Sequence, residues 1–304
     1  MSLSLAGYSG WRLPNVNELE SLINLGAVYS FSWLGTQGFT NVQDARYWTS
    51  TTLSCDAEKA WCIFSNWDDA SPGLKAESRY VWPVRSVPND SYPAPPWKTG
   101  QTISYYQGDD GDLQKGVAWP NPRFTSHDGT VTDNLTGLMW TKNTQQFSDY
   151  GAQWQSALDS VKEMNAGNYP NFGYTDWRLP NRKELCSLID YSRCNPALPS
   201  DHPFLHVKNP NPLSDFRFEY WSSTTLSPMT AFARNISICD GATSNGGKTN
   251  LDFVWLVRGG LAEASGCSSW NNVKAKYQAY KNGQATLGDV IDCYREWRGN
   301  GTDQ

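Results

Sequence analysis

The sequence contains little of what marks the common classes of enzyme and membrane protein. Its 304 residues include only three histidines, and no apolar run approaches the length needed to cross a bilayer. It has no phosphate loop, dinucleotide-binding glycine pattern, nucleophile elbow or paired-histidine zinc motif. The sequence therefore predicts a non-enzymatic protein that does not insert into a membrane, with no catalytic residues, no metal site and no cofactor.

Charge is also scarce, and its sign is wrong for nucleic acid. Charged residues make up 18% of the chain, the formal net charge is −5, and no segment forms the basic stripe that phosphate binding needs. We expect no nucleic-acid partner. Tryptophan, by contrast, is abundant: the 15 tryptophans indicate a loop-rich fold held by large aromatic side chains, or a surface that stacks on ligands, or both.

An internal duplication is the most informative feature that is present. Residues 7–25 (GYSGWRLPNVNELESLINL) are repeated at 173–191 (GYTDWRLPNRKELCSLIDY). The later strings YWTSTTLS (47–54) and YVWPVRSV (80–87) likewise return as YWSSTTLS (220–227) and FVWLVRGG (253–260). Such a repeat sets the architecture. A residue kept in both copies is expected to serve the shared fold, and one found in a single copy is free for another task.

The duplication predicts four parts of the chain. The first repeat spans 1–88, a Pro-rich linker spans 89–96, the second repeat spans 97–262, and a tail spans 263–304. The second repeat has a front part, including TVTDNLTGLMW (130–140), that has no counterpart in the first. We therefore expect the first repeat to be truncated at its N-terminus and the second to be complete.

Local patterns predict an α+β fold. The string at 130–140 reads as a hairpin around a polar turn, and apolar residues at helical spacing follow at 151–165. Asn15 with Glu18, and Asn181 with Glu184, each predict a reciprocal cap at the start of a helix. Antiparallel strands with long loops should follow in each copy. Two amphipathic segments in 263–304 predict a C-terminal helical hairpin.

The seven cysteines favour an oxidising compartment over scattered reduced thiols. Cys267 and Cys293 would lie at the same end of the helical hairpin, which predicts a disulfide between them. Cys55 with Cys62, and Cys186 with Cys194, are further candidate pairs, and Cys239 is left over.

The string WRLPN allows two interpretations. Arg12 and Arg178 could each clamp a carboxylate or sulfate ligand, or each could pair with an internal acid and lock the strand–helix corner. Because both copies keep the arginine, we favour the internal pairing. The same interpretation covers three other shared pairs: Trp48 and Trp221, Trp82 and Trp255, and Arg85 and Arg258.

The candidate ligand-binding residues lie where the copies differ, between the last two strands of each repeat. The first copy offers Asn66, Trp67, Asp68 and Asp69, and the second offers Asp240, Asn245, Lys248 and Asn250. Amides and carboxylates can bind vicinal sugar hydroxyls while an aromatic ring covers the C–H face. These segments could equally be ordinary long turns, although long loops on a rigid scaffold often carry function.

Two weaker metal candidates are also present. Asp109, Asp110 and Asp112 place oxygen ligands near one another, but the glycine and terminal glutamate of a helix–loop–helix calcium site are absent, so a solvated acidic turn is the favoured interpretation. His202 and His206 have helical spacing but lack a third ligand.

The repeated motifs together resemble a known family. WRLPN-x-x-EL-x-SLI, YWSSTT, the closing V-R-G-G and GTVTDNLTGLMW are similar to the C-terminal domain of the Legionella collagen-like adhesins, which occurs here in tandem. The resemblance implies two C-type-lectin-like domains in a secreted or cell-surface bacterial protein. For the adhesins it also implies binding of sulfated glycosaminoglycans.

Two functions are therefore expected. The first is an extracellular adhesion module whose partner is a glycan or another cell-surface ligand such as a surface protein. The second is a structural or protein–protein module that spaces a larger surface assembly. A basic or aromatic concave patch would favour the first, and a large exposed apolar patch would favour the second.

Overall fold

The computed structural model describes residues 7–64, 68–86, 96–207 and 219–259, together with positions 274, 276, 277, 280, 290, 291 and 293. The first repeat contains α1 (Val16–Glu20), α2 (Ser30–Thr36), β1 (Arg46–Leu53), β2 (Asp56–Phe64) and β3 (Ala70–Leu74). A short helix, α3 (Asp110–Leu113), follows. The second repeat contains β4 (Phe124–Ser126), β5 (Thr130–Asp133), β6 (Leu138–Thr141), α4 (Trp154–Asn165), α5 (Arg182–Ser187), β7 (Glu219–Thr225), β8 (Phe232–Ser237), β9 (Thr243–Gly247) and β10 (Val257–Gly259). Small antiparallel sheets with few helices confirm the α+β class.

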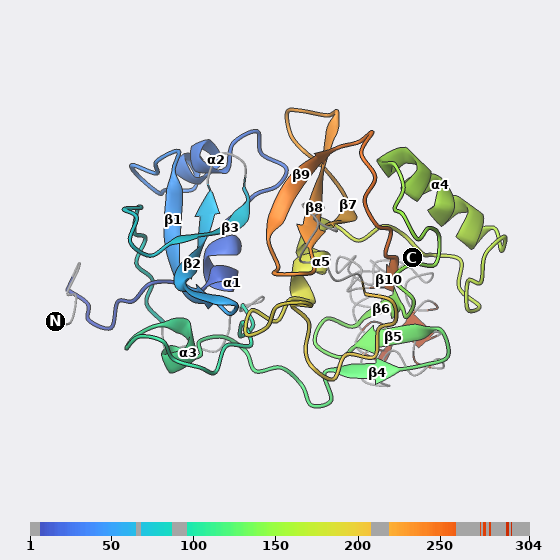
Figure 1. Ribbon diagram of the computed structural model, residues 1–304, viewed down its shortest axis with the longest axis horizontal. Helices are drawn as coiled ribbons and strands as arrows, with labels where there is room; N and C mark the ends of the chain where they lie inside the picture. Colours follow the sequence, from blue (N-terminus) through green and yellow to red (C-terminus); the bar gives the residue numbers. More distant parts are fainter. Residues whose placement is uncertain are drawn as a thin grey trace, which may run out of the picture.

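The two repeats share their strand pairing residue by residue. Sheet β1-β2-β3 pairs Tyr47 with Ile63 and Ala60 with Gly73. Sheet β7-β8-β9 makes the same pairings at the positions of the second copy, and both central ladders shift register between the shared tryptophan and a threonine. Figure 1 shows the two sheets next to each other, each with its short helix, α1 or α5, on one side. The duplicated sequence thus builds a duplicated sheet.

The WRLPN corner holds each sheet to its helix through internal contacts. Arg12 forms a two-pronged ion pair with Glu18, and Arg178 forms the same pair with Glu184 at 2.6 and 2.7 Å. Each glutamate also completes a capping box on its preceding asparagine. The internal pairing predicted for both arginines is therefore confirmed, because the carboxylate that caps the helix also binds the guanidinium.

The front part, present only in the second repeat, decides how much of each copy is buried. Strands β4, β5 and β6 join β10 in a four-stranded sheet, and α4 packs beside it (Figure 1). Trp255 is fully buried, its ring lies 5.3 Å from that of Trp140, and its indole nitrogen donates to the Thr141 carbonyl at 2.9 Å. Trp82, its counterpart, is only half-buried. The shared closing segment therefore lies in the core of the second copy and is partly exposed in the first.

This difference also explains why the closing segment is a strand in one copy only. Val257 pairs with Arg178 on one side and with Trp140 of β6 on the other. In the first repeat the described pairing of Val84 is the single bridge to Arg12, and residues 81–86 form no strand. The antiparallel strands predicted to end each copy included this closing segment, YVWPV in the first and FVWLV in the second. That prediction was wrong for the first, because a ladder needs the partner that β6 supplies.

Residues 97–115 contact the first repeat. The Asn17 side chain donates to the Trp97 carbonyl at 3.1 Å, and the Asn15 side chain donates to the Lys115 carbonyl at 3.0 Å. The acidic turn at 109–112 is largely buried here, not solvated as predicted. Asp109 caps α3, and Asp110 accepts hydrogen bonds from Thr51 and Thr99, both at 2.7 Å. Asp110 therefore joins this segment to the first repeat, and Asp109 orders the turn itself.

The remaining predictions for single segments have mixed outcomes. The hairpin at 130–140 and the helix ending before Ala166 are confirmed as β5–β6 and α4. His202 and His206 lie in an irregular segment, not on a helix, and no group of three or more His, Cys, Asp or Glu side chains in the described ranges could hold a metal ion. Within the same ranges, every helix is too short or too polar to span a membrane.

The cysteine pairs within the repeats are corrected by the structure. Cys55, Cys62, Cys186 and Cys194 are all free thiols, so neither Cys55–Cys62 nor Cys186–Cys194 is formed. Cys62 and Cys186 are buried, with Cys186 next to the Arg182 guanidinium, whereas Cys55 is exposed in the β1–β2 turn. In the tail, Cys293 is disulfide-bonded, while its predicted partner Cys267 lies outside the described residues. The proposed helical hairpin also lies outside the described residues, apart from seven helical positions. The predicted linker does too, apart from Pro96.

Candidate ligand-binding surface

The loops predicted to bind ligand face each other between the two repeats. Asp68 and Asp69, just before β3, meet the β8–β9 hairpin of the second copy, while Asn66 and Trp67 lie outside the described residues. The Arg234 guanidinium is 3.1 Å from the Asp68 carboxylate and 3.4 Å from that of Asp69. The Asn245 amide nitrogen lies 3.3 Å from the Asp69 carboxylate. Three of the predicted residues are thus brought together, but as contacts between repeats.

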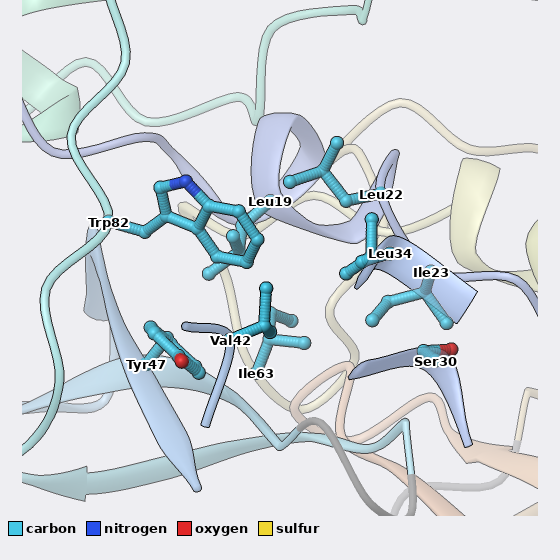
Figure 2. A pocket seen from close by; sticks show the side chains of 9 residues that line it. All are labelled: Leu19, Leu22, Ile23, Ser30, Leu34, Val42, Tyr47, Ile63 and Trp82. Carbon is cyan, nitrogen blue, oxygen red and sulfur yellow. The ribbon is translucent and has the colours of Figure 1, made fainter. Parts of the chain in front are cut away.

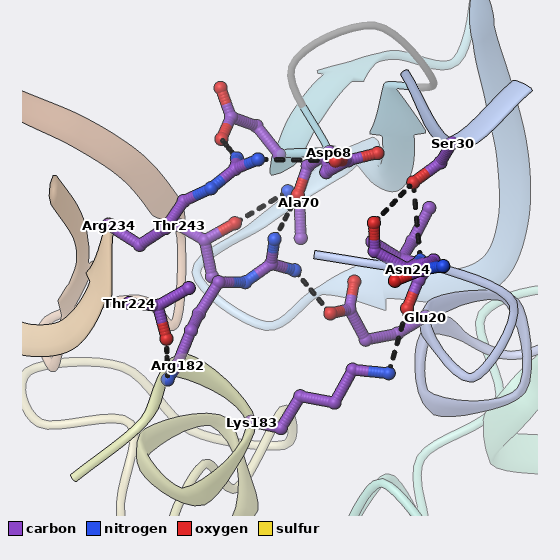
Figure 3. A network of polar contacts seen from close by, with 12 residues as sticks. Glu20, Asn24, Ser30, Asp68, Ala70, Arg182, Lys183, Thr224, Arg234 and Thr243 are labelled. Atoms are coloured by element: carbon purple, nitrogen blue, oxygen red, sulfur yellow. Dashed lines mark hydrogen bonds and ion pairs between the residues drawn. The ribbon is translucent and has the colours of Figure 1, made fainter. Parts of the chain in front are cut away.

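A second ion pair completes this repeat junction, which we define as Glu20, Asp68, Asp69, Arg182, Arg234 and Asn245. Figure 3 shows the Arg182 guanidinium reaching the Glu20 carboxylate and the Asp68 backbone carbonyl, while Lys183 donates to the Ile23 carbonyl at 2.9 Å. Arg182 and Arg234 are almost fully buried. Since buried charges require partners, the junction can hold these groups only while both repeats stay in contact.

Burial controls the ionisation of the acids in the junction. Burial raises the pKa of the Asp69 carboxyl to about 6, although the positive charge of Arg234 opposes the shift. Burial also raises the pKa of Glu20, against the opposing effect of Arg182. These acids are already engaged, and Asp68 is only 1% exposed, so the geometry assigns them to joining the repeats.

The other predicted residues lie apart from one another. The Asp240 carboxylate accepts the Ala242 backbone N–H at 3.1 Å, and Asn250 is exposed at the turn after β9. The Lys248 ammonium donates to Thr225 at 2.9 Å and lies 3.9 Å from the centre of the Trp154 ring. The six predicted residues that the structure describes therefore do not gather at one place.

Lys248 also has a counterpart that the sequence comparison missed. Lys75 follows β3 as Lys248 follows β9, and it donates to Thr52 at 2.9 Å as Lys248 does to Thr225. Its ammonium lies 4.6 Å from the Tyr106 ring centre. Both lysines thus join the end of a sheet to an aromatic ring from outside it, which is a structural role shared by the copies.

A hollow of about 540 Å³ on the first repeat has the residues expected of a ligand site. We call it the arginine hollow; its lining residues are Ala45, Arg46, Ser78, Arg79 and Tyr80. Tyr80 is 50% exposed. The Arg79 guanidinium lies 5.2 Å from the Trp48 ring centre and forms an ion pair with the exposed Glu77. Two arginines and one aromatic residue, Tyr80, thus line one concave surface.

The second repeat carries the opposite charges at the same backbone positions. Tyr80 N–H donates to the Arg46 carbonyl at 3.1 Å, and Phe253 N–H donates to the Glu219 carbonyl at 2.8 Å. Glu219 therefore occupies the position of Arg46, and Asp252, which precedes Phe253, occupies that of Arg79. The two copies therefore differ in the sign of the charge at these two positions, which is a clearer difference than that between their loops.

The acidic version of the site is closed by hydrogen bonds. The Asn235 amide donates to the Glu219 carboxylate at 2.5 Å and to the Asp252 carboxylate at 2.9 Å, and the Ser244 hydroxyl donates to Glu219 at 2.9 Å. Burial raises the pKa of Asp252 to about 6, and the nearby Glu219 charge adds to this effect. These acids are bound within the second repeat, whereas the arginine hollow lies on the first.

A simple signal in the sequence could have revealed the inversion. The shared strings were aligned from Tyr47 and Tyr220 onward, and from Tyr80 and Phe253 onward. The residue immediately before each shared aromatic differs in charge, as arginine in the first copy and an acid in the second.

Comparison with known proteins agrees with the duplicated geometry. The Lcl C-terminal domain family matches residues 1–85 and again residues 129–258, which include both WRLPN corners and both central sheets. The chain belongs to the Lcl C-terminal domain family. The tandem arrangement expected from the repeats is confirmed by the two matched segments. No curated protein matches the chain.

The first Lcl C-terminal domain repeat has a second, much smaller hollow of about 20 Å³, which is roughly the space of one water molecule. Figure 2 shows the apolar side chains around it, with Tyr47 and Trp82 on one side and α1 and α2 residues on the other. In the second repeat, Trp140 and Phe204 pack on the counterpart of Trp82. The small hollow is a packing gap next to the core.

Proposed function

We propose that this chain is a non-enzymatic adhesion module of a secreted or cell-surface protein, built from two C-type-lectin-like domains, and that the arginine hollow binds an acidic carbohydrate. The observation that carries this proposal is the combination of Arg46, Arg79 and an exposed Tyr80 in one hollow. Guanidinium groups bind carboxylate and sulfate oxygens through paired hydrogen bonds, and a tyrosine ring can cover the apolar face of a sugar. A volume of about 540 Å³ is in the range of small-molecule sites.

The family relation supports the choice of ligand class. The resemblance to the collagen-like adhesins implies binding of sulfated glycosaminoglycans, and the chain belongs to the family of their C-terminal domain. A net charge of −5 gives little long-range attraction for a polyanion. Recognition would therefore rest on local contacts in the hollow, and binding should weaken as salt is raised.

The test measures binding of a defined heparin oligosaccharide by isothermal titration calorimetry. The variant Arg46→Glu with Arg79→Asp gives the first repeat the charges of the second. We expect at least about a 100-fold loss of affinity, because two charge-assisted contacts of roughly 1.5 kcal/mol each are removed.

A matched variant controls for net charge. Lys162→Asp with Arg193→Glu makes the same change in charge at two exposed positions outside the hollow, and should leave affinity within about twofold. A desulfated oligosaccharide serves as the second control and should bind weakly. Equal affinity in the two variants, with circular dichroism showing both folded, would remove the arginine hollow from the proposal.

A second function has its own supporting observation. The buried ion pairs of the repeat junction join two domains that a flexible tandem would leave independent, as expected of a module that spaces a larger surface assembly. If no sulfated or carboxylated glycan binds the intact protein on a glycan array, this spacer function becomes the preferred one.

A further inference from the structure

Three free thiols from distant parts of the chain gather at one corner between the repeats. Cys55 lies in the β1–β2 turn of the first repeat, and Cys194 lies in the loop after α5 of the second. The two thiols lie close enough to interact, although about 140 residues of chain separate them. Neither has its sequence-predicted partner.

A separate set of contacts fixes the backbones that carry these two cysteines. The buried Gln101 amide donates to the Thr52 carbonyl and, at 3.1 Å, to the Tyr191 carbonyl. Its side-chain oxygen accepts the Thr52 N–H at 3.2 Å. The Tyr191 ring also packs edge-on against Trp61 of β2, with centroids 5.1 Å apart. Each cysteine thus lies three residues beyond a clamped position, which holds the sulfur atoms in reach of each other.

Cys55 and Cys194 are accessible to solvent, unlike the two buried cysteines. Cys55 is exposed and Cys194 is partly exposed, whereas Cys62 and Cys186 are buried. Burial of the sulfur within the pair and the interaction with Cys194 raise the pKa of the Cys55 thiol to about 12.

We propose that Cys55 and Cys194 form a disulfide that covalently joins the two repeats when the protein meets a disulfide oxidant, such as oxidised glutathione. The thiolate of one cysteine of the pair attacks one sulfur of the oxidant, whose S–S bond breaks and releases one thiolate. The other cysteine then loses its proton to solvent and attacks the first cysteine's sulfur, which releases the second thiolate. The two cysteines lose two electrons and two protons in total, and the oxidant is reduced to two thiols.

Cys239 is the nearest competitor. Its thiol donates to the Asn195 side-chain oxygen at 2.6 Å, and the Asn195 N–H donates to the Cys239 carbonyl at 2.7 Å. It therefore lies beside the residue that follows Cys194. A Cys194–Cys239 bond would remain within the second repeat and would not join the repeats.

The experiment oxidises the full chain in a glutathione buffer and maps disulfides by mass spectrometry without reduction. The expected result is a linked peptide pair containing Cys55 and Cys194, absent from Cys55→Ser and retained in Cys62→Ser. Recovery of a Cys194–Cys239 linkage, or of Cys55 as a free thiol after complete oxidation, would overturn the proposal.

A stability measurement checks the same bond independently. Because the bond closes a loop of about 140 residues, reduction should lower the wild-type Tm by about 10 °C more than it lowers the Tm of Cys55→Ser. The comparison subtracts the effect of reducing the Cys293 disulfide, which both proteins keep. Equal sensitivity to reduction in the two proteins would contradict a bond between the repeats.

Discussion

The variant Arg182→Val tests whether the repeat junction makes the two domains one unit. Arg182 is fully buried, and its guanidinium binds the Glu20 carboxylate and the Asp68 carbonyl. The first repeat supplies the substitute, because Val16 occupies the equivalent position after its N-cap. The backbone contact is also equivalent: Val16 N–H donates to Thr51 at 3.0 Å and Arg182 N–H to Thr224 at 3.1 Å. Valine therefore removes the side chain while the helix start is kept.

The expected magnitude follows from what the substitution leaves behind. Removing one partner of a buried ion pair destabilises a protein by roughly 3–5 kcal/mol, because the other charge stays buried. Lys183 and Arg234 still act on Glu20 and partly compensate its charge. We therefore expect the low end, about 3 kcal/mol, in urea unfolding at pH 7. The double variant Arg182→Val with Glu20→Gln should regain much of this loss.

The pH dependence of the stability loss in Arg182→Val shows whether a buried carboxylate causes that loss. Without Arg182, burial raises the pKa of Glu20 further, so protonation relieves the penalty as the pH falls. The destabilisation should shrink between pH 7 and pH 4.5, and this change with pH should be smaller in the double variant, where only Asp68 and Asp69 still respond to the loss of Arg182. A loss below about 0.5 kcal/mol at pH 7, or an equal loss at both pH values, would refute the account of the junction.

Three further results are expected. The pKa of Asp252 is raised from 3.8 to about 6, so the stabilising effect of its protonated form is complete below about pH 4 and is lost as the pH rises through 6. The free energy of unfolding of Asp252→Asn, measured by chemical denaturation, should therefore rise by about 3 kcal/mol relative to that of wild type between pH 4 and pH 7. Asn181→Ala removes the cap of α5 and should destabilise by about 1 kcal/mol, whereas Asn181→Asp should not. Trp255→Ala should cost about 3–5 kcal/mol in the same assay and Trp82→Ala less than half of that, because only Trp255 is fully buried; equal losses would contradict the assigned role of the front part.

The sequence by itself determined the contacts between residues close together in the chain. The capping boxes at Asn15 and Asn181 depend on residues three positions apart, and the Arg–Glu pairs of the corners depend on residues six positions apart. Alternating apolar residues specified the strands of the three-stranded sheet, and their duplication specified that this sheet would be built twice. Such contacts form between neighbours in the chain, so pattern and spacing are sufficient to predict them.

Only the tertiary structure decided what the unmatched residues do. Asp68 and Asp69 are residue types expected in a sugar-binding loop. In the structure they form ion pairs with Arg234, which is about 165 residues away in the chain. The candidate pair Cys55–Cys62 spans one turn, yet the Cys55 thiol contacts Cys194 of the other repeat. Residue type fixes which partners a group accepts. Which of several compatible partners comes within reach depends on how the two repeats dock, and no local pattern encodes that.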